Sequence, residues 1–225
     1  MNEREICKYI DRLNKGNYKE SVFTRSISKN VELAKVWGAE PKRTDTVVGL
    51  FHSNRFFFIK NEMNEYVGAI YDMGYDLHWY VVPKNRKKGY LSKALEEVIL
   101  PYIFDERDVQ EITIVKGSIG RKNYESSLRV AKKLGFKESL SKSNTFELKR
   151  DDLDWERVNI FESYNPISED RMQELKKRAF FAFKTLYKIS DEMEMAYVDN
   201  FELDELVKQI EKSTVIIDDL YWRGK

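Results

Sequence analysis

A run of cations that ends in glycine, residues 86–89, stands between two stretches with strong apolar patterns. The stretch before it, residues 76–82, is rich in aromatic and β-branched side chains, as is typical of a buried strand. Pro83 cannot extend a central strand, so the strand ends there. After the glycine, apolar residues recur at helical spacing over residues 91–103. Because a helix N-terminus offers unpaired N–H groups and a positive dipole end, this order predicts a binding site for a phosphate or pyrophosphate.

The segments around this site predict a sheet. Aromatic and apolar runs at residues 55–61 and 66–72, joined by short turns to residues 76–82, indicate an antiparallel meander. A strand at residues 111–115 follows the helix, and the order strand, helix, strand predicts a parallel crossover. The remaining elements that we expect are a helix at residues 3–13, a strand at 21–27, a short helix at 31–37 closed by Gly38, a helix at 123–134, and strands at 136–139 and 145–149.

A second block begins at Asn123 and ends in Lys-Leu-Gly-Phe, whose glycine is Gly135. Together the two blocks resemble the GNAT superfamily of acyl-CoA-dependent N-acetyltransferases. In that family a Val-x-Pro-like strand end is followed by Arg or Gln, two residues, Gly, one residue, and Gly or Ala. This chain has Val-Val-Pro and then, from Arg86, Arg-Lys-Lys-Gly-Tyr-Leu. Leu91 replaces the small residue, as in some members of the ribosomal-protein acetyltransferase branch, which this chain resembles most in motif. The resemblance covers residues 55–149.

The resemblance implies that acetyl-CoA is the co-substrate, and it names the residues that hold it. Backbone amides after the cationic turn would bind the pyrophosphate, and the cations of the turn would add charge. Backbone groups of the preceding strand and one asparagine would hold the pantetheine arm. The cofactor-binding residues implied in this way are Val81, Val82, Arg86, Lys87, Lys88, Gly89, Tyr90, Leu91, Ser92 and Asn123.

Two side chains are candidates for the catalytic proton transfers. Many family members carry a general-acid tyrosine four residues before the glycine of the later helix, and here that position is Ala131. The serine-bearing branch implies instead that Ser127 contacts the cofactor sulfur. Counting from Asn123 puts Ser126 in that place, and either serine can also be read as an ordinary helix cap. His78 is a catalytic candidate only if its strand carries a bulge, because it alternates onto the face opposite the one that family bases use.

Composition limits the classes of function. Among the 225 residues, 39 Lys and Arg nearly balance 38 Asp and Glu, so no overall charge draws the chain to nucleic acid or to a membrane surface. One cysteine excludes an internal disulfide and fits a cytoplasmic location. With one cysteine and two histidines, no metal site is expected. The sequence shows neither a signal peptide nor an apolar run long enough to span a membrane.

Residues 151–225 lie outside the resemblance and predict a helical extension. After a polar connector, Ser168 caps a helix in which apolar residues from Met172 to Met193 alternate steps of three and four, the period of a coiled coil. A second apolar stripe runs from Leu203 to Leu220. These helices fit either a hairpin that packs on its own domain or an arm that joins two copies into a homodimer. The sequence does not decide between the two.

These patterns predict an α+β protein. Residues 1–150 would form a GNAT-like domain with a mixed, mostly antiparallel sheet flanked by helices, and residues 151–225 the helical C-terminal extension. By resemblance, the domain transfers an acetyl group from acetyl-CoA to a primary amine of a protein N-terminus or of a small molecule. The alternative is a catalytically silent acyl-CoA-binding or scaffolding protein, because the tyrosine of the family is missing. The loops that would select the acceptor carry no transferable motif.

Overall fold

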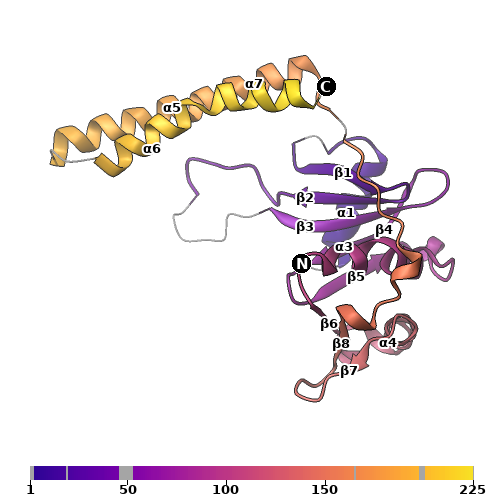
Figure 1. Ribbon diagram of the computed structural model, residues 1–225. Helices are drawn as coiled ribbons and strands as arrows, with labels where there is room; N and C mark the ends of the chain where they lie inside the picture. The colour runs from indigo at the N-terminus through magenta and orange to yellow at the C-terminus, as the bar shows by residue number, and fades with distance from the viewer. Residues whose placement is uncertain (1–2, 19, 46–52, 165, 198–200, 225) are drawn as a thin grey trace. The chain divides into compact units, whose positions relative to one another are not determined.

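The computed structural model describes residues 3–18, 20–45, 53–164, 166–197 and 201–224. Contacts divide the chain into two units, residues 1–163 and residues 164–225. In the described part, the first unit is an α+β structure with a five-stranded and a three-stranded sheet, and the second unit is helical (Figure 1). The segment 151–163, which the sequence assigned to the extension, contacts the first unit. The Asn159 amide donates to the Glu97 carbonyl at 2.8 Å, and the Phe161 amide to the Ile27 carbonyl at 3.1 Å.

An antiparallel sheet with the strand order β1-β2-β3-β4-β5 forms the centre of the first unit. Its central strand shows why this sequence forms a sheet. Phe56, Phe57 and Phe58 of β3 are fully buried, so side chains on both faces of the strand are covered. The five strands are β1 (Val22–Ser28), β2 (Val31–Val36), β3 (Asn54–Lys60), β4 (Tyr66–Asp72) and β5 (Leu77–Val81).

Helices cover both faces of this sheet. On one face lies α1 (Glu3–Asn14), whose buried stripe is Ile6, Tyr9, Ile10 and Leu13. The other face packs against a continuous helical segment, which consists of α2 (Tyr90–Ala94), a π-helical section (Leu95–Ile99) and α3 (Leu100–Phe104). Figure 1 shows α1 and α3 on opposite sides of the strands. In β5, Leu77 belongs to the core under α3 and Tyr80 to the core under α1, as the period of two requires.

The second sheet has the order β6-β8-β7 and is antiparallel. Its strands are β6 (Val109–Thr113), β7 (Lys137–Glu138) and β8 (Thr145–Lys149). Between β6 and β7 runs α4 (Lys116–Lys133), which begins earlier than the predicted residue 123. A kink divides α4 at Gly120, whose φ of 73° and ψ of 159° are not helical. The helix proper therefore starts after Gly120, close to the predicted start.

The two sheets meet at a parallel bridge between Asp76 and Glu111. The Glu111 amide donates to the Tyr75 carbonyl at 3.1 Å, but the Thr113 amide donates to the Asp76 carboxylate at 2.9 Å. In a longer parallel ladder, the Thr113 amide would donate to a β5 carbonyl. Here it donates to the Asp76 side chain instead. In the described residues, the predicted parallel pairing is therefore present at this bridge, after which β5 and β6 diverge.

The prediction of a short helix at residues 31–37 is wrong, because this segment is strand β2. It pairs antiparallel with both β1 and β3. Val31, Ala34 and Val36 are buried, and the two valines favour a strand. Hydrogen bonds to strands on both sides stabilise the extended conformation, and this effect is larger than the weak helical preference of the segment before Gly38.

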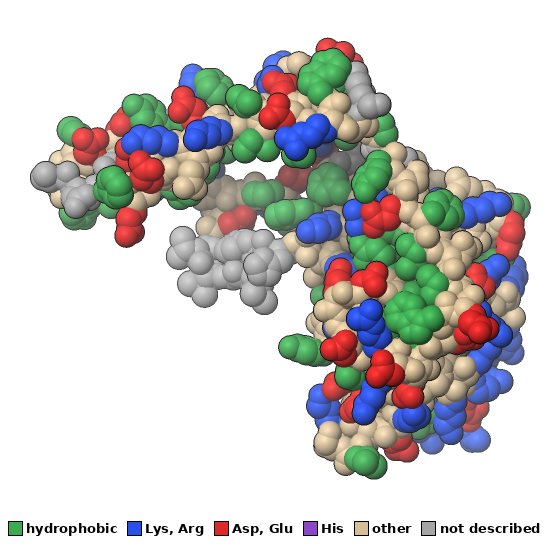
Figure 2. Space-filling view, in the orientation of Figure 1, with side chains coloured by type: hydrophobic (Ala, Val, Ile, Leu, Met, Phe, Trp, Pro, Cys, Tyr) green, Lys and Arg blue, Asp and Glu red, His purple; other side chains and the backbone are tan. Residues whose placement is uncertain are grey.

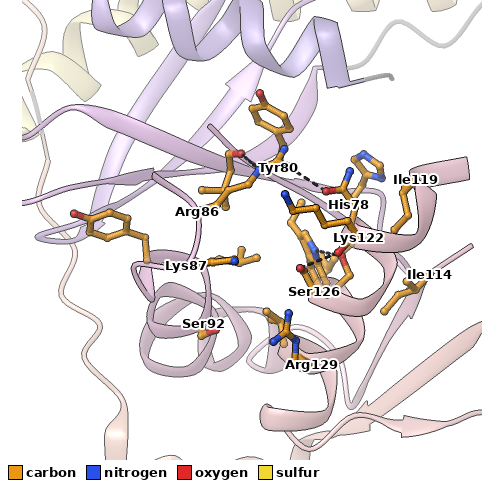
Figure 3. Close-up of a pocket in the computed structure, with 18 of the residues that line it drawn as sticks. His78, Tyr80, Arg86, Lys87, Ser92, Ile114, Ile119, Lys122, Ser126 and Arg129 are labelled. Atoms are coloured by element: carbon orange, nitrogen blue, oxygen red, sulfur yellow. Dashed lines mark hydrogen bonds between the residues drawn. The ribbon is translucent and has the colours of Figure 1, made fainter. Parts of the chain in front are cut away.

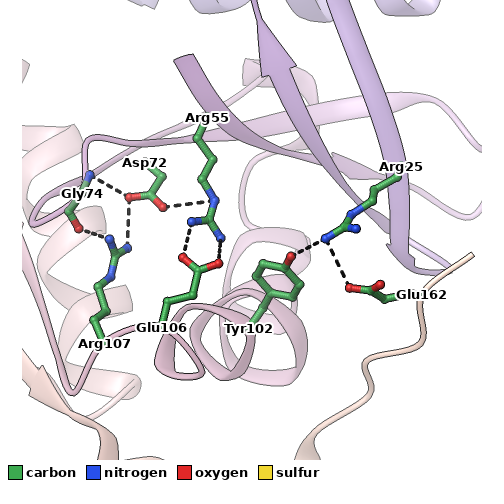
Figure 4. A network of polar contacts seen from close by, with 8 residues as sticks. All are labelled: Arg25, Arg55, Asp72, Gly74, Tyr102, Glu106, Arg107 and Glu162. Atoms are coloured by element: carbon green, nitrogen blue, oxygen red, sulfur yellow. Dashed lines mark hydrogen bonds and ion pairs between the residues drawn. The ribbon is translucent and has the colours of Figure 1, made fainter. Parts of the chain in front are cut away.

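A buried carboxylate joins the ends of several elements in the first unit (Figure 4). The Asp72 side chain, which is 2% exposed, lies 3.0 Å from Arg107 Nη2 and 3.5 Å from Arg55 Nε. Arg55 also pairs with Glu106, with Nη2 3.0 Å from Oε1. The network links β3 and β4 to the chain between α3 and β6. Removing one arginine would leave a buried charge less compensated, which costs roughly 3–5 kcal/mol for a fully buried pair.

The second unit consists of α5 (Glu169–Tyr197), which packs against α6 (Phe201–Glu211) and α7 (Ser213–Arg223). The predicted second helix is thus two helices. Among its described residues only Met172, Ser190, Val207 and Tyr221 are buried. Figure 2 shows many apolar side chains on the visible surface of these helices. No helix in the described ranges is long and apolar enough to cross a membrane. The large exposed apolar residues include Phe180, Phe181, Tyr187, Ile189, Met193, Leu206, Val215, Ile216, Leu220 and Trp222.

Candidate functional site

A cavity of about 560 Å³ opens in the first unit where β5 and β6 diverge (Figure 3). Its walls come from β5, from the cationic turn and the start of α2, from the end of β6, and from one face of α4. The described residues that line it include Leu77, His78, Trp79, Tyr80, Val81, Arg86, Lys87, Gly89, Tyr90, Leu91, Ser92, Ile114, Ile119, Lys122, Asn123, Ser126, Ser127, Arg129 and Lys133.

The turn before α2 has two residues in the left-handed region. Lys87 has φ of 64° and Gly89 has φ of 85°. For a lysine this conformation costs roughly 1–2 kcal/mol, and such strain concentrates at binding sites. Turns of this kind aim successive amides at one point and bind anions. Apart from its chain neighbours, a Cβ on Gly89 would meet no atom of the described residues within 4 Å, so these residues leave space beside the glycine for a ligand.

Arg86 connects the end of β5 to α4. Its Nε donates to the Val81 carbonyl at 2.9 Å, and its Nη1 donates to the Asn123 side-chain oxygen at 3.1 Å. The guanidinium carbon lies 5.8 Å from the centre of the Tyr80 ring. Three directional contacts therefore fix this cation at the edge of the cavity, where it orients Asn123 as well as adding charge.

The α4 helix adds cations that the sequence analysis missed. Lys122, Arg129 and Lys133 line the cavity, and Ser126 lies between them. Their spacing of four, three and four residues places all four on one helix face, and this pattern was readable in the sequence. With Arg86 and Lys87, five cations line the cavity, against one carboxylate, Glu3, among the described lining residues. Such a cavity favours an anionic ligand.

The two candidate serines make different contacts. Ser127 Oγ accepts a hydrogen bond from Trp79 Nε1 at 3.2 Å, across the cavity from α4 to β5. Ser126 Oγ donates to the Lys122 carbonyl of its own helix at 2.9 Å. A hydroxyl that accepts one bond keeps its proton for another acceptor, whereas the Ser126 proton is already used. The geometry therefore favours Ser127 over Ser126 as the hydroxyl that can donate into the cavity.

Ala131 occupies the position where many GNAT enzymes have a tyrosine, and it is fully buried in the core. No acid can act from there. His78 does not lie on the Trp79 face, because the β4–β5 register is continuous from Asp72 to Gly68 and contains no bulge. It nevertheless lines the cavity. Burial lowers the pKa of His78 below its ordinary value, although the Asp76 and Glu3 carboxylates act in the opposite direction.

The structure brings together most of the residues that the resemblance named. Two of them do not line the cavity. Val82 continues the β5–β4 pairing, and its amide donates to the Val67 carbonyl at 2.9 Å. Lys88 donates to the Asn85 side-chain oxygen at 3.3 Å. The other ten, including both catalytic candidates, share the cavity, so residues far apart in the sequence converge on one site.

Comparison of the chain with protein-family models, with curated proteins and with solved structures found no match. The class of the protein therefore rests on its fold and its site. The fold is α+β, and the site is a cationic cavity at the joint between two sheets, beside an edge of β5 that pairs with no strand of the described residues past the Asp76–Glu111 bridge. These features fit an elongated anion with groups that can pair with a strand.

Proposed function

We propose that the protein is a GNAT-type N-acetyltransferase that moves an acetyl group from acetyl-CoA to a primary amine of a protein N-terminus or of a small molecule. The observation that carries the proposal is the cavity at the divergence of β5 and β6, with the turn 86–89 at its end. The sheet order is the second support, since β5, α2 and β6 follow one another in the chain and the two sheets diverge beside them.

The residues present fit coenzyme A. The amides of Gly89, Tyr90 and Leu91 begin a helix and have no intrahelical acceptor, so they are suited to a pyrophosphate. Lys87 and the α4 cations supply charge for the phosphates. The edge of β5 beside the cavity offers backbone groups to the amides of a pantetheine arm, in the manner of an added strand. The apolar side chains of the lining would exclude water from the thioester.

The chain's own side chains provide one clear catalytic group. Ser127 is held by Trp79 with its proton free, so it can donate to the sulfur when the thiolate leaves. A hydrogen bond to a developing thiolate lowers the barrier only if it is made in the transition state. Ser127 thus takes the place of the missing tyrosine.

The rival proposal is a silent acyl-CoA-binding protein. It is favoured by one observation, the burial of Ala131 where an acid is expected. Both proposals require that coenzyme A binds in the cavity. They differ in turnover, which a thiol-release assay measures with acetyl-CoA and a panel of amines and peptide N-termini. Binding without thiol release on any acceptor would support the silent protein and contradict the transferase.

A matched pair of variants tests the binding site itself. Lys122 lines the cavity, whereas Lys132 is an exposed residue of the same helix outside the lining. Lys122→Gln should weaken CoA binding by roughly fivefold, as expected for loss of one exposed ion pair, and Lys132→Gln should leave it unchanged. Calorimetry at low salt measures both. Equal affinities in the two variants would show that the cavity does not hold the phosphates.

A further inference from the structure

The cavity continues around the free edge of β5 to the opposite face of the strand. His78 and Tyr80 point to the face that packs against α1, and Trp79 points to the face that packs against α4. All three nevertheless line the same cavity. In Figure 3, His78 and Tyr80 lie on one side of the strand, and Ser126 and Arg129 lie on the other. The continuity is possible because β6 turns away after the Asp76–Glu111 bridge.

The far side of the cavity differs in charge from the side that the cations line. Glu3, at the start of α1, is its one carboxylate among the described lining residues. His78 Nε2 is buried and has no hydrogen-bond partner in the described part of the chain. A buried imidazole nitrogen without a hydrogen bond costs free energy, unless a bound ligand supplies the partner. The Arg86 guanidinium lies over the Tyr80 ring at the border of this side, where it is bound to the Val81 carbonyl and the Asn123 side chain. The other side chains here are a base, a hydroxyl and an anion, which suit a cationic amine.

The protonation states of His78 and Tyr80 also suit a cationic amine. His78 is faced by Asp76 next to its own strand and by Glu3 from α1, and Lys122 lines the same cavity from α4. Burial outweighs the two carboxylates, so the pKa of His78 lies below its ordinary value and the imidazole is neutral near pH 7. Burial and a hydrogen bond with the Cys7 side chain raise the pKa of Tyr80 to about 12, so its hydroxyl stays protonated and uncharged near pH 7.

We propose that this side of the cavity binds the acceptor, that the acceptor is a small amine with a second positive charge, and that His78 is the general base while Glu3 binds the second charge. The inference rests on the proposed acetyl transfer and specifies its substrate. An acceptor with a carboxylate would be repelled by Glu3 and drawn towards the cations at the other end. A diamine would have a partner for each nitrogen: the neutral imidazole of His78 for the nitrogen that reacts, and the Glu3 carboxylate for the other.

In the proposed transfer, protons move between the acceptor, His78 and Ser127. His78 Nε2 accepts a proton from the acceptor's ammonium group, which frees the nitrogen lone pair. That pair forms a bond to the thioester carbonyl carbon, and the carbon–sulfur bond then breaks with its electron pair on sulfur. The nitrogen gives up its second proton, which replaces the proton that the Ser127 hydroxyl donates to the sulfur. The products are the N-acetylamine, the free thiol and one proton on His78, which passes to water.

The test is thiol release from acetyl-CoA with 1,4-diaminobutane and with 1-aminobutane as acceptors. The protein as it stands should prefer the diamine, and Glu3→Gln should reduce kcat/KM for the diamine roughly fivefold, as for an exposed ion pair, and leave the monoamine unchanged. His78→Gln should reduce kcat/KM for both amines by about 100-fold. In the unsubstituted protein the rate should fall as the pH drops below the pKa of His78, because the imidazole is then protonated. His78→Gln should not show this fall. Asp11→Asn, which removes an exposed carboxylate of α1 outside the lining, is the control.

Affinity for CoA, measured by calorimetry on each variant, separates the two proposals and shows that the variants fold. A chain that binds no CoA overturns the proposed function, and this inference falls with it. A chain that transfers acetyl groups but shows the same selectivity with Glu3→Gln, or the same pH profile with His78→Gln, overturns the inference alone. CoA binding without turnover on either amine also overturns it.

Discussion

Replacing Gly89 with alanine should separate the effect of backbone strain from the effect on ligand binding. Gly89 has φ of 85°, and an added Cβ meets no atom of the described part of the chain within 4 Å, the two neighbouring residues apart. The strain should therefore cost about 1–2 kcal/mol of unfolding free energy without a clash. For a unit of this size, that lowers Tm by roughly 2–8 °C. The methyl group, however, lies where a phosphate must approach the amides. Loss of one charge-assisted hydrogen bond, roughly 1.5–3 kcal/mol, would weaken CoA binding by about 10- to 100-fold.

Gly16 provides the control for this experiment. It follows α1, has φ of 68°, and an added Cβ likewise meets no atom of the described residues within 4 Å, its chain neighbours apart. Gly16→Ala should cost a similar amount of stability and leave CoA binding unchanged, because it lies outside the cavity lining. Thermal melts and calorimetry on both variants measure the two quantities. If both variants bind CoA with equal affinity, or if both lose it together, the assignment of the 86–89 turn as the phosphate site is refuted.

The remaining predictions concern three other features. Ser127→Ala should lower kcat about tenfold with little change in CoA affinity, and Ser126→Ala should be mild, so the reverse ranking in steady-state kinetics would contradict the assignment. The hydrogen bond from Arg55 holds the pKa of Glu106 below its ordinary value, so its stabilising contribution is complete above that ordinary value and is lost as the pH falls through the lowered one. The difference in Tm between the native chain and Glu106→Gln should therefore shrink from about pH 6 to about pH 3, and a constant difference would contradict this. The exposed apolar surface of residues 164–225 should make the full chain dimeric in light scattering, and a strictly monomeric chain at high concentration would exclude the homodimer.

Local patterns predicted the elements that carry the site. The strand that ends at Pro83, the turn with its glycine and the helix that follows are all short-range signals, and each appears where the sequence placed it. The α4 cations were also predictable, since Lys122, Arg129 and Lys133 share a helix face by spacing alone. The strand at Val31–Val36 was not, because pairing on both edges decided its conformation against its local pattern.

The shape of the cavity depends on contacts that no local pattern contains. His78 lies on the face opposite Trp79, as strand alternation predicts, and it nevertheless lines the cavity. The expectation that a residue on that face cannot reach the site without a bulge was therefore wrong. That expectation assumed a closed sheet, in which the two faces of β5 are separated. The bond from the Thr113 amide to the Asp76 side chain opens the sheet, and it joins residues 37 positions apart. Only the folded chain shows that both faces reach one cavity.

The divergence of β5 and β6 also affects how the protein would behave without a ligand. Past the Asp76–Glu111 bridge, β5 pairs with β4 on one side in the described residues, and its other edge faces the cavity. Among the carbonyls on β5, that of Val81 is covered by Arg86. Unpaired strand edges can pair with other chains and cause aggregation. A ligand that bonds along this edge would act as a cap against such association. Purification and storage with coenzyme A should therefore keep the protein in solution longer than storage without it.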